Sequence, residues 1–238
     1  MTIEASERAP VNQSIERAAR LLSLFSVEEP ELSLAELTAR LATSKATAHR
    51  YATALRRAGL LRATPRGYAL GPRVVELAAT ALAGLRIVKV AGPYLERLVA
   101  DANETAVLSV WDGEAPVVVR VEDNTDRLVR INVRPGSRLP LDSAQGQIFC
   151  AFLGESGDPD LALVRARGFA FDASTVEGIA ALAAPVFQGG EVVATMALVG
   201  TTASLPPERE CPPATLLRET ASALSSELGF LGAERTRT

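Results

Sequence analysis

Apolar residues in the first part of the chain recur at helical spacing. Over residues 14–25 they fall on Ile15, Ala18, Ala19, Leu22 and Phe25, which predicts a first helix. The motif Ser33-Leu34-Ala35-Glu36 has the form of a capping box, in which a serine begins a helix and a glutamate three positions later completes the cap. We therefore expect a second, short helix after Ser33, followed by a tight turn at Ala42-Thr43.

A longer helix is predicted from about Ser44 to Ala58, with Gly59 at the following position, where a positive φ is tolerated. Its two faces differ in chemistry. One face carries Ala48, Tyr51, Ala52 and Leu55. The opposite face, with its flanks, carries Lys45, Ala46, Thr47, His49, Arg50, Thr53 and Arg57.

Residues 60–70 have the pattern of strand, turn and strand, with the turn over residues 63–67. Three helices with a tight turn before the third, followed by such a hairpin, indicate a winged helix-turn-helix. In that fold the third helix lies in the DNA major groove. A small helical bundle whose polar face meets water fits the same periodicity, so the pattern alone leaves both interpretations open.

The remainder of the chain predicts an α+β domain. Residues 74–85 form a helix too apolar for a free linker, so a dimer partner or the second domain should cover it. A helix over about 87–102 follows. Strands are expected at 105–111, 117–121, 128–133, 179–187 and 191–199, and helices at 143–153 and from near Pro213 to Leu228. This order indicates a mostly antiparallel sheet with helices packed on it.

The charges divide the chain in two. Residues 1–85 hold 11 Lys and Arg against 8 Asp and Glu, whereas residues 86–238 hold 14 against 20. Between Glu36 and Glu76 there is no acidic residue but there are eight basic ones: Arg40, Lys45, Arg50, Arg56, Arg57, Arg62, Arg66 and Arg73. A compact basic patch attracts a polyanion, and neutralised phosphates supply most non-specific nucleic-acid affinity.

Other features exclude several classes of protein. The two cysteines, Cys150 and Cys211, are too few for a disulfide framework, and the single histidine, His49, cannot form a His-rich metal cluster. The sequence lacks a long apolar span and a secretory leader, so we expect a cytoplasmic protein without a membrane partner. It also contains no Gly-x-Ser-x-Gly, P-loop or Gly-x-Gly-x-x-Gly motif, which argues against an enzyme, and we expect no cofactor and no metal.

Several motifs, in order, resemble the IclR family of bacterial transcriptional regulators. They are Ser14-Ile15-Glu16-Arg17-Ala18, the helix opening at Ser33, Ser44-Lys45-Ala46-Thr47-Ala48-His49-Arg50, Tyr68-Ala69-Leu70-Gly71-Pro72, Arg138-Leu139-Pro140-Leu141, Ser143-Ala144-Gln145-Gly146 and residues 178–187. Each motif is weak alone, but their order and spacing make the resemblance specific. It covers residues 14–230.

The resemblance implies a winged helix-turn-helix domain (residues 11–73), a linker helix (74–86) and a GAF-like effector-binding domain (87–231). It also implies a homodimer or homotetramer that binds a palindromic DNA operator and responds to a small molecule, with a carboxylate or an aromatic metabolite as the expected class. The segment from Leu153 to Gly168 is shorter than usual in the family. We therefore expect helices that normally cover part of the pocket to be missing.

Two sets of site residues follow. The DNA-binding candidates are Ser33, Ser44, Lys45, Ala46, Thr47, His49, Arg50, Thr53, Arg57 and Arg66. The resemblance places Leu139, Ala144, Gln145, Asp172, Ile179 and Ala181 around the effector. Strand alternation adds Ser109, Arg130 and Val133, and the helix that begins at Ser143 offers free N–H groups. A protein-interaction module and, less well supported, a small-metabolite enzyme remain the alternatives.

Overall fold

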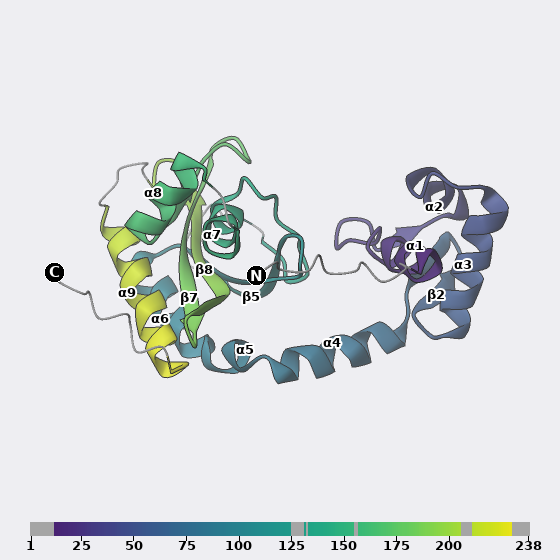
Figure 1. Ribbon diagram of the computed structural model, residues 1–238, viewed down its shortest axis with the longest axis horizontal. Coiled ribbons are helices and arrows are strands. Elements are labelled where there is room, and N and C mark those ends of the chain that lie inside the picture. Colours follow the sequence, from purple (N-terminus) through teal and green to yellow (C-terminus); the bar gives the residue numbers. More distant parts are fainter. Residues whose placement is uncertain (1–11, 125–130, 132, 155–156, 206–210, 230–238) are drawn as a thin grey trace, which may run out of the picture. The chain divides into compact units, whose positions relative to one another are not determined.

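The computed structural model describes residues 12–124, 131, 133–154, 157–205 and 211–229. Contacts divide the chain into two compact units, between Leu82 and Ala83. Each unit has its own hydrophobic core. Figure 1 shows the helices and strands of both units. The boundaries at 73/74 and 86/87 that the sequence suggests stay predictions.

The first unit combines three helices with a small antiparallel sheet. Its elements are α1 (Gln13–Leu22), β1 (Glu31–Leu32), α2 (Leu34–Arg40), α3 (Lys45–Arg57), β2 (Leu61–Thr64) and β3 (Gly67–Leu70). The strand order is β1-β3-β2. The core is made mainly of leucines from all three helices and both outer strands: Leu21, Leu32, Leu37, Leu55 and Leu61, with Ala52. This arrangement is the predicted winged helix-turn-helix.

Two details of this unit differ from the sequence prediction. The first helix ends at Leu22 rather than Phe25, because the backbone N–H groups of Leu24 and Phe25 bond to carbonyls three positions back instead of four. The strand β1 was not predicted. It pairs Glu31 and Leu32 with the wing strand β3, and two residues are too few for a periodic signal.

The helix α4 (Pro72–Gly84) spans the division between the units. None of its residues is buried, and Val75 and Leu77 are 71% and 55% exposed. The predicted helix is therefore present, but none of the described residues buries its apolar side chains.

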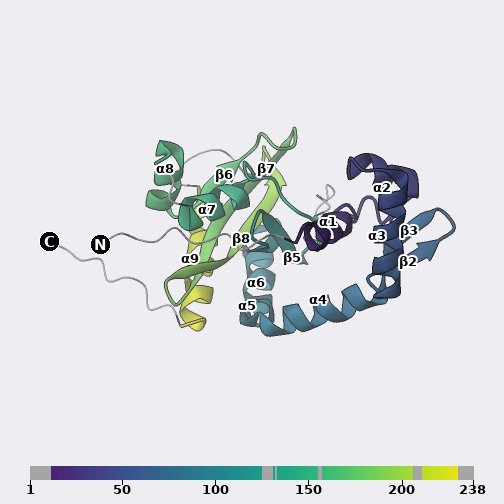
Figure 2. The ribbon, with the colours of Figure 1, turned by 45° about the vertical axis from the view of Figure 1, so that its right-hand side comes forward.

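The second unit is a five-stranded antiparallel sheet with helices on both faces (Figures 1 and 2). Its helices are α5 (Arg86–Val90), α6 (Gly92–Ala102), α7 (Ala144–Leu153), α8 (Pro159–Arg167) and α9 (Pro212–Glu227). Its strands are β4 (Thr105–Trp111), β5 (Pro116–Glu122), β6 (Ala170–Asp172), β7 (Ile179–Gln188) and β8 (Glu191–Thr201). The strand order is β5-β4-β8-β7-β6.

Alternation along the strands separates two hydrophobic layers. Leu108, Leu182 and Met196 face α6 and α9, whereas Val107, Ala183 and Ala197 face α7 and α8. The β7–β8 turn uses Gly189 and Gly190, both with positive φ (58° and 91°), as the predicted hairpin requires. The α+β class is confirmed.

Several predicted elements of this unit need correction. The helix expected over 87–102 is two helices, interrupted at Ala91 just before Gly92-Pro93, where proline supplies no N–H. The helix α8, which lies in the short segment between Leu153 and Gly168, and the strand β6 were not predicted. The strand expected over 128–133 lies mostly outside the described residues, and Ile131 and Val133 are not in a strand.

Candidate functional site

The helix α3 separates a buried face from a basic one. Ala48, Ala52 and Leu55 are buried in the core of the first unit. The opposite face is exposed at Lys45, Ala46, His49, Arg50 and Arg57, while Thr47 and Thr53 are half-buried. The prediction that helical periodicity separates these two sets is therefore met.

Serine caps fix the starts of α2 and α3. The Ser33 hydroxyl accepts from the Glu36 N–H at 3.2 Å, and the Glu36 carboxylate accepts from the Ser33 N–H at 2.7 Å. The Ser44 hydroxyl accepts from the Thr47 N–H at 3.2 Å and donates to the Thr47 hydroxyl at 2.9 Å. Both serines of the DNA-binding set therefore position the helices from which the other side chains project.

Tyr51 of α3 interacts with two residues of α1. Hydrogen bonds with Ser14 and then Arg17 lower the pKa of the Tyr51 phenol below its ordinary value, although burial opposes them. The Arg50 guanidinium lies over the Tyr51 ring, 5.8 Å from its centroid. This contact keeps Arg50 close to the helix surface while its charge stays exposed.

The wing places Arg66 at an exposed turn between β2 and β3. Gly67 follows it with φ +154°, and a Cβ atom there would lie 2.3 Å from the Leu32 carbonyl oxygen. Glycine is therefore required for β3 to approach β1. This close approach fixes where the wing turn lies.

The basic patch is mostly unpaired. Among its eight basic residues, Arg40 forms a two-bond ion pair with Glu29, at 2.6 and 2.7 Å. The other seven form no ion pair with a carboxylate within the part of the chain that is described. Unpaired cations on one small unit favour a polyanionic partner.

The predicted effector residues of the second unit largely surround one cavity of about 110 Å³. Leu139, Ser143, Gln145, Asp172, Ile179 and Ala181 all line it. Ala144 does not line it, because its side chain is buried in the core between α7 and the sheet. Arg130 lies outside the described residues.

Ser109 orients the Gln145 side chain, which lines this cavity. The Gln145 side-chain amide donates to the Ser109 hydroxyl at 3.0 Å, and both residues are buried. Ser109 itself is not among the residues that line the cavity. It orients the amide that is.

The start of α7 forms one wall of the cavity. The Ser143 hydroxyl accepts from the Gly146 N–H and donates to the Pro140 carbonyl, at 3.2 and 2.6 Å. A Cβ atom on Gly146 would lie 2.4 Å from the Leu141 carbonyl oxygen. Glycine is thus what lets the preceding loop pack against α7.

Asp172, at the end of β6, brings a carboxylate to the cavity. Burial raises its pKa, but hydrogen bonds from Thr175 and Ser174 outweigh burial, so the pKa lies below the ordinary value. The Thr175 hydroxyl donates at 2.5 Å, and Ser174 donates through both its N–H (2.8 Å) and its hydroxyl (2.7 Å). The cavity therefore holds an anionic acceptor at neutral pH.

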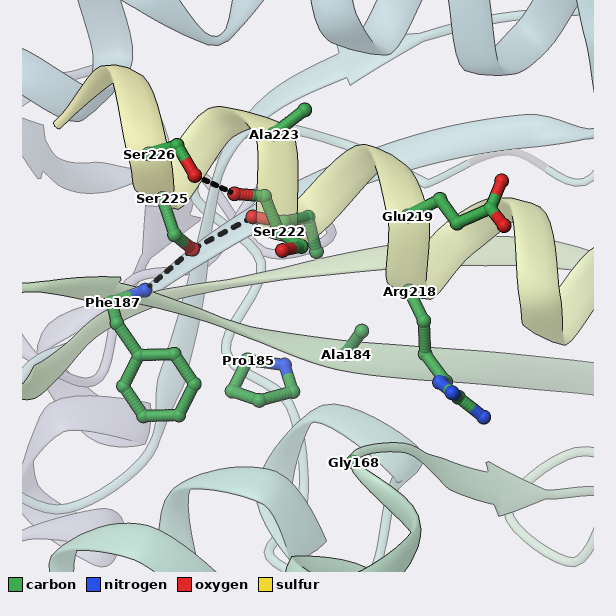
Figure 3. A pocket seen from close by; sticks show the side chains of 11 residues that line it. Gly168, Ala184, Pro185, Phe187, Arg218, Glu219, Ser222, Ala223, Ser225 and Ser226 are labelled. Atoms are coloured by element: carbon green, nitrogen blue, oxygen red, sulfur yellow. Dashed lines mark hydrogen bonds between the residues drawn. The ribbon is translucent and has the colours of Figure 1, made fainter. Parts of the chain in front are cut away.

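The sequence reasoning missed much of the apolar lining of this cavity. Val107 of β4, Val176 and Val199 of β8 also contribute. Ser109 was predicted to lie near the effector, and strand alternation places Val107 on the same face of the sheet as Ser109. Alternation could therefore have identified Val107 as a lining residue. A second hollow, of about 590 Å³ between α9 and the edge of β7, was not predicted at all (Figure 3).

A basic winged helix-turn-helix and a separate α+β unit that contains a small-molecule cavity together define a ligand-responsive DNA-binding regulator. The IclR helix-turn-helix domain matches residues 14–65, and the C-terminal domain of the bacterial transcriptional regulator IclR matches residues 79–158. Among the described residues, no helix is long and apolar enough to cross a membrane.

Three individual relatives are similar to this chain over more than nine-tenths of its length. The glycerol operon regulatory protein of Streptomyces griseus is 30% identical over 91% of this chain and 96% of its own. The DNA-binding transcriptional repressor YiaJ of Escherichia coli K12 is 28% identical over 95% and 92%. A crystal structure of an IclR homologue from Microbacterium hydrocarbonoxydans, complexed with 4-hydroxybenzoate, has the same fold, with a TM-score of 0.72 at 23% identity over 91% and 99%.

The chain belongs to the IclR family of bacterial transcriptional regulators. It is a DNA-binding transcriptional regulator with a helix-turn-helix domain and a C-terminal ligand-binding domain.

Proposed function

We propose that the chain binds a palindromic operator as a homodimer or homotetramer, and that a small molecule in the Asp172 cavity changes its affinity for DNA. The observation that carries the proposal is the exposed, mostly unpaired basic face of α3 and the wing. The recognition helix of such a fold enters the major groove while flanking groups hold the phosphates.

Each predicted DNA contact has a role that fits its position. Lys45 and Arg50 bind phosphates or guanine edges, since a bidentate Arg–guanine contact is the commonest specific one. His49 contacts a base or phosphate on the same exposed face. Arg66, at the wing turn, reaches the backbone or the minor groove.

The other residues of the predicted DNA-binding set have smaller side chains or lie at the ends of helices, and each has a proposed contact with DNA. Thr47 and Thr53 offer hydroxyl and methyl groups, and Arg57 holds a phosphate near the end of α3. Ala46 leaves room for a base edge to approach. Ser33 and Ser44 place their helix N-termini at phosphates, where free N–H groups favour an anion.

A second copy of α4 is the partner we propose for the uncovered linker helix. An isolated 13-residue helix is marginal in water, so packing has to stabilise it. Val75 and Leu77 supply apolar side chains for that packing. A two-fold dimer then presents its recognition helices to two half-sites of a palindrome.

The cavity favours a compact effector with an apolar body and a hydroxyl group. The valines, Leu139 and Ile179 supply apolar contacts, Asp172 accepts from the hydroxyl, and the start of α7 can hold an oxygen atom. A cavity of about 150 Å³ accommodates benzene in an engineered protein. At about 110 Å³ this one takes a small ring or a short hydroxy acid after slight expansion.

Two considerations support this reading over the alternatives. A related structure holds 4-hydroxybenzoate, a small hydroxylated ring. Membership of a family of transcriptional regulators favours regulation over catalysis.

Footprinting the purified protein on the DNA upstream of its own gene tests the operator, and we expect protection of two related half-sites. A screen of small hydroxylated aromatics and hydroxy acids by thermal shift tests the cavity. We expect at least one compound to raise the melting temperature of the wild type and to change the footprint. Ala181→Leu should abolish this stabilisation, because leucine fills the cavity. A single unpaired half-site, or a hit insensitive to Ala181→Leu, would contradict the proposal.

A further inference from the structure

The hollow between α9 and the edge of β7 lies outside the proposed effector site and shares no lining residue with it. It runs along the edge of the sheet, with α9 on one side and Gly168 on the other (Figure 3). Gly168 is the C-cap residue of α8. Its volume of about 590 Å³ is within the range of about 300–1,000 Å³ that small-molecule sites occupy.

This edge of the sheet is closed to an added strand. The strand β6 pairs with β7 only at Ala181–Ala183, so Ala184 to Phe187 continue beyond it. Pro185 has no N–H, and the Phe187 N–H donates to the Ser225 hydroxyl at 3.0 Å. Strand addition needs free backbone donors, so the groove is unsuited to a peptide in extended conformation.

Two hydrogen-bond donors on α9 lack partners beside this groove. Arg218 extends from α9 toward Gly168, whereas the carboxylate of neighbouring Glu219 points away (Figure 3). Ser222 follows Arg218 by four residues, and so the two lie on one face of the helix. Neither side chain makes a hydrogen bond or ion pair with any described residue.

The absence of a partner for Arg218 is informative because most cations of this unit are engaged. Arg120 pairs with Glu122 at 2.7 Å, and Arg138 with Glu114 at 2.8 Å. Arg86 donates to the Glu227 carbonyl. Within the described part of the second unit, only Lys89, Arg167 and Arg218 lack such contacts, in a unit with an excess of acidic residues.

The floor that β7 gives to the groove is apolar. The Pro185 and Phe187 rings lie on the same side of β7, and the Phe187 ring packs edge-on against Phe152, 5.3 Å between centroids. An apolar floor beside an unpartnered guanidinium and hydroxyl is complementary to a molecule with a carboxylate and a hydrophobic body.

We propose that this groove is a second small-molecule site, which binds compact organic carboxylates through Arg218 and Ser222. The two cavities present different charged groups: Asp172 brings a carboxylate to the effector cavity, whereas Arg218 extends a guanidinium toward this groove and the Glu219 carboxylate points away (Figure 3). A carboxylate is attracted to the Arg218 guanidinium, whereas in the effector cavity it has to lie away from Asp172, at the start of α7. The two sites therefore present different charges to a ligand in the same domain.

The test is a titration of the full chain with benzoate, in which ligand-observed NMR measures binding. Benzamide serves as the neutral counterpart. An open groove predicts a dissociation constant near or below about 1 mM for benzoate. Arg218→Ala should weaken benzoate binding about tenfold, since it removes a charge-assisted pair. Arg218→Lys should weaken it less, and benzamide should bind poorly to every variant.

Two control variants separate the sites. Arg97→Ala removes an exposed arginine of α6 that is 82% accessible, and it should leave benzoate binding unchanged. Ala181→Leu fills the effector cavity and should also leave it unchanged. Loss with Ala181→Leu but not with Arg218→Ala would place benzoate in the effector cavity and overturn the proposal.

Absence of benzoate binding by the wild type would also overturn it. So would a change of oligomeric state on Arg218→Ala, measured by sedimentation, because the groove would then be an interface between copies. Neither result bears on operator binding, so failure here is distinguishable from failure of the proposed function.

Discussion

Asp172 is a buried carboxylate whose hydrogen bonds are all local. It accepts from Ser174 and Thr175 in the turn that follows β6, and these bonds favour its charged form against the cost of burial. Since its pKa is lower in the folded chain than the ordinary 3.8, the folded state prefers the ionised group. The stability this provides is present above about pH 4 and is lost as the pH falls through the folded pKa.

Asp172→Asn tests this assignment. We expect a lower urea midpoint of unfolding than for the wild type at neutral pH, because asparagine offers a single acceptor atom for these donors. The difference between the two proteins should begin to shrink below about pH 4, where the aspartate protonates in the unfolded chain, and should continue to shrink as the pH falls through the lowered pKa of Asp172 in the folded chain. Asp101→Asn, which changes an exposed aspartate of α6, is the matched control. A difference that stays constant with pH would contradict the assignment.

Ser33 illustrates how one side chain can combine two roles. Its hydroxyl caps α2, and it is also a candidate phosphate contact. Capping serines contribute about 1 kcal/mol when compared with alanine, but glycine at the same position costs only a few tenths. The two substitutions therefore separate the cap from the contact.

We expect Ser33→Ala to lower the free energy of unfolding by about 1 kcal/mol, and Ser33→Gly by much less. If the hydroxyl also binds a phosphate, both variants should lose DNA affinity to a similar extent. The measurements are chemical unfolding and fluorescence anisotropy with operator DNA. If Ser33→Gly keeps the full affinity for DNA, the hydroxyl caps α2 but does not bind a phosphate.

At the scale of elements, the start of α7 depends on a glycine. The Pro140 and Leu141 carbonyl oxygens would lie 2.5 and 2.4 Å from a Cβ atom on Gly146. Both atoms belong to backbone, so relief requires the loop or the helix to move. Because Ser143 and Gln145 lie in the same turn, such movement changes the wall of the effector cavity.

Gly146→Ala should therefore destabilise the chain by about 1–3 kcal/mol, as overpacking does, and abolish the thermal shift produced by an effector. DNA binding without effector should persist, since the first unit has its own core. Gly84→Ala is the control, because nothing lies within 4 Å of the added atom. A normal effector response in Gly146→Ala would show that the close approach is dispensable.

The elements that the sequence predicted correctly are those with a long apolar period or a strong turn signal. The helix α3, with its serine cap and Gly59, is one example, and the β7–β8 hairpin with its paired glycines is another. The strands β1 and β6 have two and three residues. They exist because a partner strand is present, and pairing across sequence distance leaves no local pattern.

The candidate site shows the same distinction. Exposure of Arg50 and burial of Ala52 follow from helical periodicity and could be predicted. The Gln145–Ser109 bond joins residues 36 positions apart, and the Arg218 groove joins α8, β7 and α9. Neither follows from spacing, because each depends on which elements the sheet order brings together.

At the scale of the whole molecule, the proposed dimer depends on α4. Its apolar side chains are exposed, and packing against a second copy would bury them. We expect the double variant Val75→Glu and Leu77→Glu to sediment as a monomer while remaining folded. Lys89→Glu, on α5, should leave the oligomeric state unchanged. A variant that stays dimeric would exclude α4 from the interface.

The central claim is that the basic face of α3 binds a specific DNA site, and salt-dependent fluorescence anisotropy tests it most directly. The full chain is titrated against DNA upstream of its gene, with non-specific competitor, over a series of salt concentrations.

We predict competitor-resistant binding that weakens steeply with salt, by about 0.9 in log–log slope for each phosphate neutralised. Arg50→Ala should lower the affinity about tenfold or more, while Arg97→Ala, in the other unit, should have no effect. Equal affinity for random DNA, together with an Arg50→Ala variant that binds like the wild type, would contradict the account.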